Sequence, residues 1–296
     1  MFEVFFSTQS FYFSADYDLT VQFNENLSRG FKQKDHDERF YYNEAFARKL
    51  KTIGLESWIQ PFINGLVVQS SIAVNQKETY FTLISRRDKM RAGMRFISRG
   101  SDQSGNVSNF AETEQIMVSS SPDFYDVFTY LQIRGSIPIV WRQSPSLKWS
   151  PKLEIEANKM KNMSAFDNHL INVKKNYGDA TFVNLIDKKG SQLKIGQYMT
   201  ELFRTNEDKK LHYVWFDFHA ECKNMKWNNL SKLIAEVKEF IQSYKYGQYR
   251  VTKNVRSCDS HCSLNRSSQE RSSRTNQESS EPTAWTAWIE QTSCKV

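Results

Sequence analysis

The sequence has no run of about 18 apolar residues, so it predicts no helix that spans a bilayer. Cysteine is scarce, with four among 296 residues. Their spacing does not form a disulfide framework, and we expect a reducing, cytosolic compartment. The opening stretch MFEVFFSTQSFYFS lacks a basic leading segment and contains Glu3, so it predicts short strands and not a secretory signal peptide.

The charge balance favours cations, with 40 basic and 33 acidic residues and a net charge of +7. This excess indicates a phosphorylated ligand, an acidic membrane surface or nucleic acid as partner, or only a soluble surface. Hydrophobic residues make up 39% and aromatic residues 14% of the chain, which is enough for a core. The length fits one large domain or two modest ones.

Apolar periodicity predicts strands that alternate with helices, and therefore an α/β fold with a mixed central sheet and flanking helices. We predict strands within residues 58–74, 79–87, 137–141, 181–187 and 212–218. We predict helices within residues 37–51, with Asp37 as the cap, and within 123–135, 163–178 and 228–244. Residues 248–296 are rich in Ser, Arg, Asn and Gln without a period, which predicts a mostly disordered tail.

The stretch RRDKMRAGMRFISRG concentrates arginines before a polar turn, DQSGNVSN. Guanidinium groups match phosphate oxygens, and a Gly and Asn turn can aim N–H groups at an anion. The alternative is an arginine-rich face that is simply solvated. The five residues concerned are Arg86, Arg87, Arg91, Arg95 and Arg99.

The stretch FDFHAECKNMKW follows an apolar strand and places Asp217, His219 and Glu221 at alternate positions. In an extended segment these three side chains share one side. A metal site would need a further ligand, and Cys222 would point the other way, so support of a catalytic loop or plain strand-end polarity is favoured. Arg134 is placed at a predicted helix end, as a phosphate contact or a cation favourable there.

A second cluster, CDSHC, has the residue types of a zinc site. It lacks a second ligand pair at a useful distance, and its serine-rich setting favours coincidence.

Together these segments resemble the Sac-domain phosphoinositide phosphatases across residues 10 to 235. The branch most similar is anchored in endoplasmic reticulum and Golgi membranes and chiefly removes the 4-phosphate of phosphatidylinositol 4-phosphate. The stretches that carry the resemblance are SFYFSADYDLT, DERFYYN, WIQPFINGLV, LISRRDKMRAGMRFISRGSDQSGNVSNFAETEQI, FTYLQIRGSIPIVW, YGDATFVNLIDKKG and HYVWFDFHAECKNMKW.

The resemblance implies a phosphoinositide on a membrane surface as the partner, with no nucleic acid, and no metal or cofactor. It implies a location at the cytosolic face of those membranes, or a cytosolic or peripheral one for a chain without a predicted span. The substrate-binding residues it implies are Arg86, Arg87, Arg91, Arg95, Arg99, Arg134, Asp217, His219 and Glu221.

The family's catalytic loop has a cysteine, five residues and an arginine, and this spacing is broken here. Leu264 and Ser268 stand six positions after Cys258 and Cys262. Cys258 is the best remaining nucleophile and Arg266 the best remaining phosphate clamp. The functional alternatives are therefore a cysteine-dependent phosphatase and an inactive phosphoinositide-binding fragment.

The resemblance also implies a domain shortened at both ends. Residues 1–40 are expected to be the end of a β-rich subdomain, residues 41–247 an incomplete catalytic domain, and residues 248–296 a divergent tail.

Overall fold

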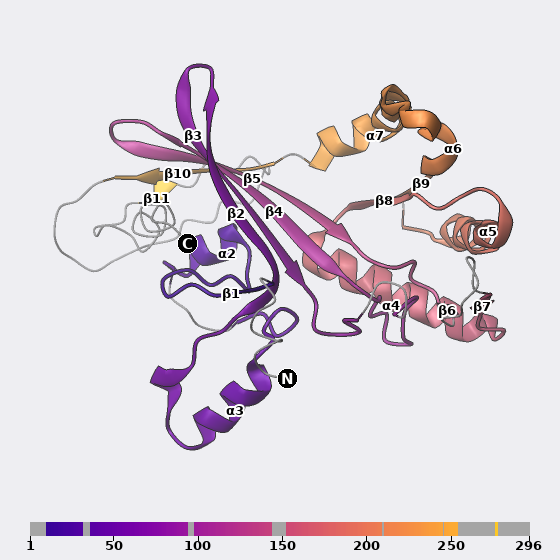
Figure 1. The fold of residues 1–296 in the computed structure, drawn as a ribbon, viewed down its shortest axis with the longest axis horizontal. Helices are drawn as coiled ribbons and strands as arrows, with labels where there is room; N and C mark the ends of the chain where they lie inside the picture. Colours follow the sequence, from indigo (N-terminus) through magenta and orange to yellow (C-terminus); the bar gives the residue numbers. More distant parts are fainter. Residues whose placement is uncertain are drawn as a thin grey trace. The chain divides into compact units, whose positions relative to one another are not determined.

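The computed structural model describes residues 10–31, 36–93, 98–143, 152–208, 210–244, 246–253 and 276–277. The chain divides into two compact units, and Figure 1 labels their helices and strands. The first comprises residues 1–89, 111–133 and 246–296, and the second comprises residues 90–110 and 134–245. The predicted domains 1–40, 41–247 and 248–296 were drawn from the family resemblance and stay a prediction.

A seven-stranded sheet organises the first unit, in the order β1-β2-β3-β4-β5-β10-β11. Strand β2 pairs antiparallel with β1 and β3, β3 with β4, and β5 with β10, whereas β11 runs parallel to β10. Asn75 and Gln76 join β2 to β3 with φ of 51° and 64°, the conformation of a tight hairpin turn. The strands are β1 Phe11–Tyr12, β2 Ile63–Val74, β3 Lys77–Arg87, β4 Ala111–Ser120, β5 Phe124–Arg134, β10 Gly247–Thr252 and β11 Asn276–Gln277.

One face of this sheet is buried, because side chains alternate along β3 and β4. The buried positions on this face of β4 are Glu112, Glu114, Ile116 and Val118. Helix α2 (Phe23–Ser28) and the residues before it belong to the same core, in which Phe23 lies 5.4 Å from the Tyr249 ring of β10. Helix α3 (Glu44–Thr52) and the turn η1 (Glu56–Trp58) complete the unit, and Ala47 is the buried residue of α3.

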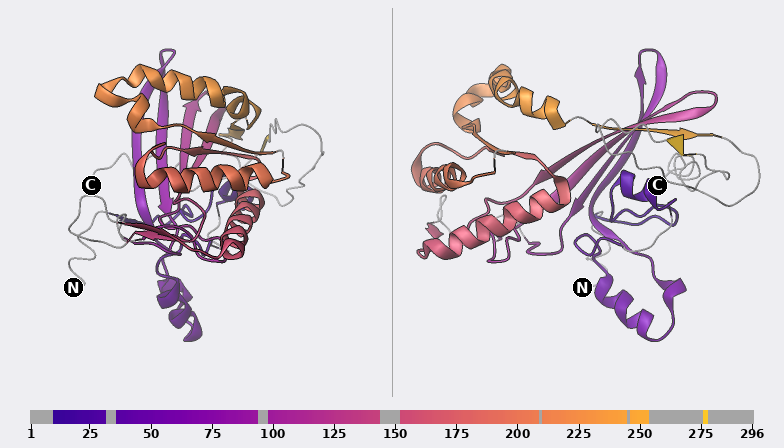
Figure 2. Two further views of the ribbon diagram at one scale, coloured as in Figure 1. Left: turned by 90° about the vertical axis from the view of Figure 1, so that its right-hand side faces the viewer. Right: turned by 180° about the vertical axis from the view of Figure 1, so that it is seen from behind.

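Two parallel strands, β8 (Ala180–Asn184) and β9 (Leu211–Trp215), form the centre of the second unit. Helices α4 (Lys159–Tyr177) and α5 (Gly190–Thr205) lie on one side of them and α7 (Leu230–Tyr244) on the other (Figure 2). Strands β6 (Trp141–Gln143) and β7 (Leu153–Ile155) form an antiparallel pair. The short elements α6 (Phe218–Glu221), η2 (Lys223–Met225) and η3 (Trp227–Asn229) connect β9 to α7.

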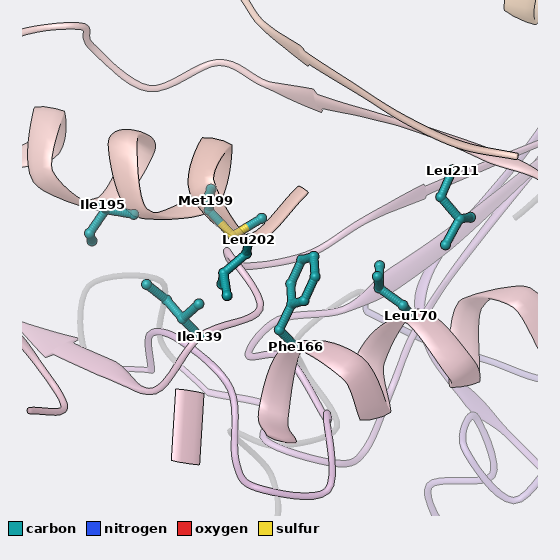
Figure 3. Close-up of a cluster of buried hydrophobic side chains, with 7 residues drawn as sticks. All are labelled: Ile139, Phe166, Leu170, Ile195, Met199, Leu202 and Leu211. Carbon is teal, nitrogen blue, oxygen red and sulfur yellow. The ribbon is translucent and has the colours of Figure 1, made fainter. Parts of the chain in front are cut away.

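Hydrophobic side chains from α4, α5, β9 and the segment before β6 form the core of the second unit (Figure 3). Burying each such side chain stabilises the unit by about 1.5–3 kcal/mol. Asn158 caps α4 by accepting from the N–H groups of Met160 and Lys161, and Gly178 ends it with φ of 79°. The cluster consists of Ile139, Phe166, Leu170, Ile195, Met199, Leu202 and Leu211.

The predicted fold class is confirmed, since helices flank a mixed set of strands. Strand β2 and helix α7 lie within their predicted ranges. Strands β3, β8 and β9 and helix α4 overlap theirs but begin one to four residues earlier. No helix among the described residues is long and apolar enough to cross a membrane.

Several local predictions were wrong. Residues 123–135 form strand β5 and not a helix, and the strand predicted at 137–141 is confined to Trp141 at the start of β6. Helix α3 begins at Glu44 after Asn43, so Asp37 is not its cap. Instead Asp37 accepts from the backbone and side chain of Arg39. Helices α2 and α5 were not predicted.

Candidate functional site

Arg86 lies inside the sheet of the first unit, with 0% of its side chain exposed. Its Nη2 donates to Glu114 Oε2 at 2.6 Å, and its Nε lies 3.5 Å from Glu112 Oε1. The β3–β4 register causes this, because Arg86 is opposite Glu112 and the strand period brings Glu114 to the same face. Arg86 is therefore a buried cation that is paired within the sheet, and its predicted contact with a headgroup stays a prediction.

The carboxylates beside Arg86 have an unusual electrostatic setting. Burial raises the pKa of Glu114, although Arg86 and the N–H of Phe23 act in the opposite direction. Burial lowers the pKa of Arg86, but Glu112 and Glu114 outweigh it and the pKa lies above its usual value. One guanidinium thus compensates two carboxylates in a region without solvent, and each group depends on the others.

Two further members of the arginine segment, Arg91 and Arg99, make contacts within the second unit. Arg91 adopts φ of 50°, its Nε donates to Ser108 Oγ at 3.2 Å, and its Nη2 donates to the Arg99 carbonyl at 2.9 Å. The Arg99 guanidinium lies 5.7 Å from the centroid of the Trp141 ring. Both side chains are half-buried and stabilise the loop that follows β3.

The remaining predicted arginines are placed differently. Arg87 is half-buried on β3, where its Nη1 donates to Asn64 Oδ1 at 3.4 Å. Arg134 is exposed at the end of strand β5, and therefore not at a helix end as predicted. Arg95 lies outside the described residues. The arginine segment thus belongs partly to the buried sheet and partly to the second unit.

The carboxyl ends of β8 and β9 bring together two loops that carry charged side chains. Asp217 begins α6, and its Oδ1 accepts from Ala220 N at 2.9 Å while its Oδ2 accepts from Lys188 N at 2.8 Å. Burial acts to raise the pKa of Asp217, but these two N–H groups hold it below its usual value. Asp217 is thus ionised and committed to the backbone.

His219 and Glu221 have separate partners on either side of α6. His219 Nδ1 lies 2.7 Å from Asp187 Oδ1, and the imidazole is 73% exposed. Glu221 Oε2 accepts from Lys232 Nζ at 2.7 Å. The alternation predicted for this trio was wrong, because a helical turn starts at Phe218 and turns the side chains in different directions.

Sequence reasoning missed the loop after β8, which supplies Asp187, Lys188 and Lys189. A signal was present, since these charged residues directly follow an apolar strand and precede a glycine. In parallel sheets ligands bind outside the carboxyl ends of the strands, which is where this loop lies.

The predicted catalytic residues Cys258 and Arg266, and the CDSHC stretch, lie outside the described residues. Within the described ranges, Cys222 is a free, buried cysteine. The same ranges hold no group of three or more His, Cys, Asp or Glu residues that could bind a metal ion.

The SacI homology domain family matches residues 1–223 of the chain. The chain belongs to this family. The match includes the arginine segment, both parallel strands and the Asp217–His219 turn, so the features described above are parts of a SacI homology domain.

Individual relatives extend the match beyond residue 223. Phosphatidylinositol-3-phosphatase SAC1 of Saccharomyces cerevisiae is 36% identical over 248 residues, which cover 81% of this chain and 39% of that protein. Phosphatidylinositol-3-phosphatase SAC1-B of Danio rerio is 34% identical, over 81% of this chain and 41% of that protein. Phosphatidylinositide phosphatase SAC2 of Mus musculus is 31% identical, over 83% of this chain and 24% of that protein. The chain thus spans about two fifths of the length of the SAC1 relatives.

Proposed function

We propose that this protein is a phosphoinositide phosphatase, which removes a phosphate group from phosphatidylinositol phosphates. The observation that carries the proposal is the SacI homology match over residues 1–223, together with relatives named as phosphatases of phosphatidylinositol lipids. The excess of cations, with a net charge of +7, fits an anionic lipid partner.

The chemistry proposed is transfer of the phosphoryl group to a cysteine thiolate. The thiolate attacks phosphorus, the bond to the inositol oxygen breaks, and that oxygen leaves with a proton from an acid. Water then cleaves the cysteinyl phosphate, which releases inorganic phosphate and restores the thiol group. Cys258 is the proposed nucleophile and Arg266 the proposed clamp on the phosphate oxygens.

Arg87, Arg91, Arg95, Arg99 and Arg134 are proposed to contribute to the basic surface that faces the lipid, together with the turn that carries Asp217, His219 and Glu221. Three of these arginines, Arg87, Arg91 and Arg99, are only half-buried in the structure. Their charges therefore act on the surrounding potential, which attracts an anionic membrane over a distance of about 10 Å at ordinary salt.

Preference for the 4-phosphate, and a place at the cytosolic face of endoplasmic reticulum and Golgi membranes, are finer parts of this proposal. The SAC1 relatives carry the name of a 3-phosphatase. Release of phosphate should therefore be compared between vesicles that contain phosphatidylinositol 4-phosphate and vesicles that contain the 3-phosphate. Faster release from the 4-phosphate supports the proposed preference, and faster release from the 3-phosphate contradicts it.

Cys258→Ser tests the mechanism, because a hydroxyl at that position is a far weaker nucleophile than a thiolate. We expect phosphate release to fall to background in this variant. Cys294→Ser is the matched control, since it removes another cysteine from the same tail. Equal release by wild type and Cys258→Ser would exclude Cys258 as the nucleophile.

A second function has a specific observation in its favour. None of the four cysteines precedes an arginine with five residues between them, so the spacing that closes the family's phosphate loop is absent from the sequence. The protein would then bind phosphoinositides without hydrolysing them. Binding to phosphoinositide vesicles with no phosphate release by wild type would favour this function over the phosphatase.

A further inference from the structure

Four contacts at the strand ends hold the loops after β8 and β9 together. The Asn184 carbonyl accepts from Phe216 N at 2.9 Å, and the Ile186 carbonyl accepts from Trp215 Nε1 at 2.9 Å. The third contact is the hydrogen bond from Lys188 N to Asp217 Oδ2. The fourth is the pair formed by His219 Nδ1 and Asp187 Oδ1. Residues 184–188 and 215–219 therefore form one cross-linked surface whose side chains are held in place.

The His219–Asp187 pair contributes little to stability, because an ion pair at an exposed position is worth about 0–1 kcal/mol. Its geometric effect is larger. A histidine whose Nδ1–H donates to a carboxylate has its ring orientation and tautomer set, and its Nε2 is left for another partner. Since the ring is 73% exposed, that nitrogen is accessible to a ligand from solvent.

Two lysines directly follow Asp187, the partner of this histidine, in the loop after β8. Lys188 and Lys189 are both exposed, and neither makes an ion pair within the described part of the chain. Lys188 Nζ lies 5.5 Å from the centroid of the Trp215 ring, the last residue of β9, which places its charge at the strand end. Of the nearby carboxylates, Asp187 contacts His219 and Asp217 accepts from two backbone N–H groups. The charge of Lys189 also helps to lower the pKa of Asp217, which places this ammonium group on the same side of the loop.

We propose that His219, Lys188 and Lys189 bind a phosphate group of an inositol phosphate at the carboxyl ends of β8 and β9. Asp187 is a positioning residue that holds the imidazole through Nδ1. Identification of the ligand as an inositol phosphate rests on the proposed function. The three residues predicted from sequence thus have different roles in this proposal. His219 faces the ligand, whereas Asp217 and Glu221 hold the protein together.

The experiment uses the full chain with two sources of the same phosphate chemistry. One arm titrates free inositol 1,4-bisphosphate while the histidine ring protons are followed by nuclear magnetic resonance, with His219→Gln used to assign the signal. The other arm measures co-sedimentation with vesicles that contain phosphatidylinositol 4-phosphate, against phosphatidylserine vesicles of equal charge.

Lys188→Gln with Lys189→Gln should weaken binding in both arms about tenfold or more, because hydrogen bonds to charged groups are lost. Lys175→Gln with Lys238→Gln removes the same number of exposed charges elsewhere in the second unit and should leave affinity unchanged. Asp187→Asn keeps an oxygen acceptor for Nδ1–H and should bind nearly as wild type, whereas Asp187→Ala should bind more weakly.

An unmoved His219 signal at saturating ligand, or equal affinity of the two lysine pairs, overturns the proposal. If either result is obtained and the lysine variants still release phosphate normally, the proposed binding site is wrong and the phosphatase proposal stands. If free inositol phosphate moves the His219 signal but vesicles show neither preference nor turnover, the binding site stands and the phosphatase proposal fails.

Discussion

Arg86 and His219 both lie beside carboxylates, but Arg86 is 0% exposed within the sheet of the first unit, whereas His219 is 73% exposed at the strand ends of the second. A buried charge loses its hydration and is tolerated only with close partners. An exposed pair costs little and stabilises little, so it remains available for binding. Burial, and not the number of charges in a segment, therefore decides which charged groups of this chain hold the fold together.

The largest expected effect comes from breaking the buried cluster. Arg86→Met leaves Glu112 and Glu114 without their cation and should lower the free energy of unfolding by about 3–5 kcal/mol. The midpoint of urea denaturation measures it. Arg134→Met, at an exposed position, is the control and should change stability by less than about 0.5 kcal/mol. Similar effects of the two variants would contradict the assignment of Arg86 as structural.

A buried histidine sharpens the contrast with His219. His169 donates through Nδ1 to the Gly105 carbonyl at 3.0 Å, and burial lowers its pKa to about 4. The unfolded chain takes up this proton near pH 6.5, so stability falls as pH drops from about 6.5 to 4, by about 3 kcal/mol.

The check is the pH dependence of urea midpoints for wild type and His169→Asn. Asparagine keeps an N–H donor for Gly105 but does not titrate, so the difference between the two proteins should shrink as the pH falls. Parallel curves from pH 7 to 4 would show that His169 protonates equally in both states.

A surface hydrogen bond without a buried charge should have an intermediate effect. Asn158→Ala removes the side-chain oxygen that accepts from Met160 N and Lys161 N at the start of α4. We expect a loss of about 1 kcal/mol in the free energy of unfolding. Asn158→Asp, which keeps an acceptor, should retain most of the stability, and an equal loss in both variants would argue against capping.

The smallest effect is expected for an exposed ion pair. Arg142 Nε lies 2.8 Å from Glu154 Oε2 across β6 and β7, and the arginine side chain is 79% exposed. Arg142→Met should cost less than about 1 kcal/mol, and 1 M salt should remove most of the difference. A loss as large as that of Arg86→Met would break the comparison between buried and exposed cations.

Sequence predicted the elements of the second unit well where one periodic signal was uncontested. Helix α4 combines helical spacing with Gly178 at its end, and β8 and β9 are short apolar runs. The helix predicted within residues 123–135 was wrong, because the helical spacing of Phe124, Val127, Phe128 and Leu131 is a coincidence. Both faces of β5 are at least half-buried along most of its length, so an alternating pattern is weak and tertiary packing decides.

The candidate site was predictable only in part. The Asp217–His219 segment is recognisable from its residues, but its turn geometry depends on contacts with the β8 loop that are distant in sequence. The burial and pairing of Arg86 could not be predicted for the same reason. Its partners Glu112 and Glu114 lie on another strand, and the register that brings them together is not encoded locally.

Binding and turnover of phosphoinositide vesicles by the full chain test the central claim most directly. The account predicts preference for vesicles with phosphatidylinositol 4-phosphate over phosphatidylserine vesicles of equal charge, with phosphate release that depends on Cys258. Equal association with both kinds of vesicle, and no phosphate release from any phosphoinositide, would contradict it.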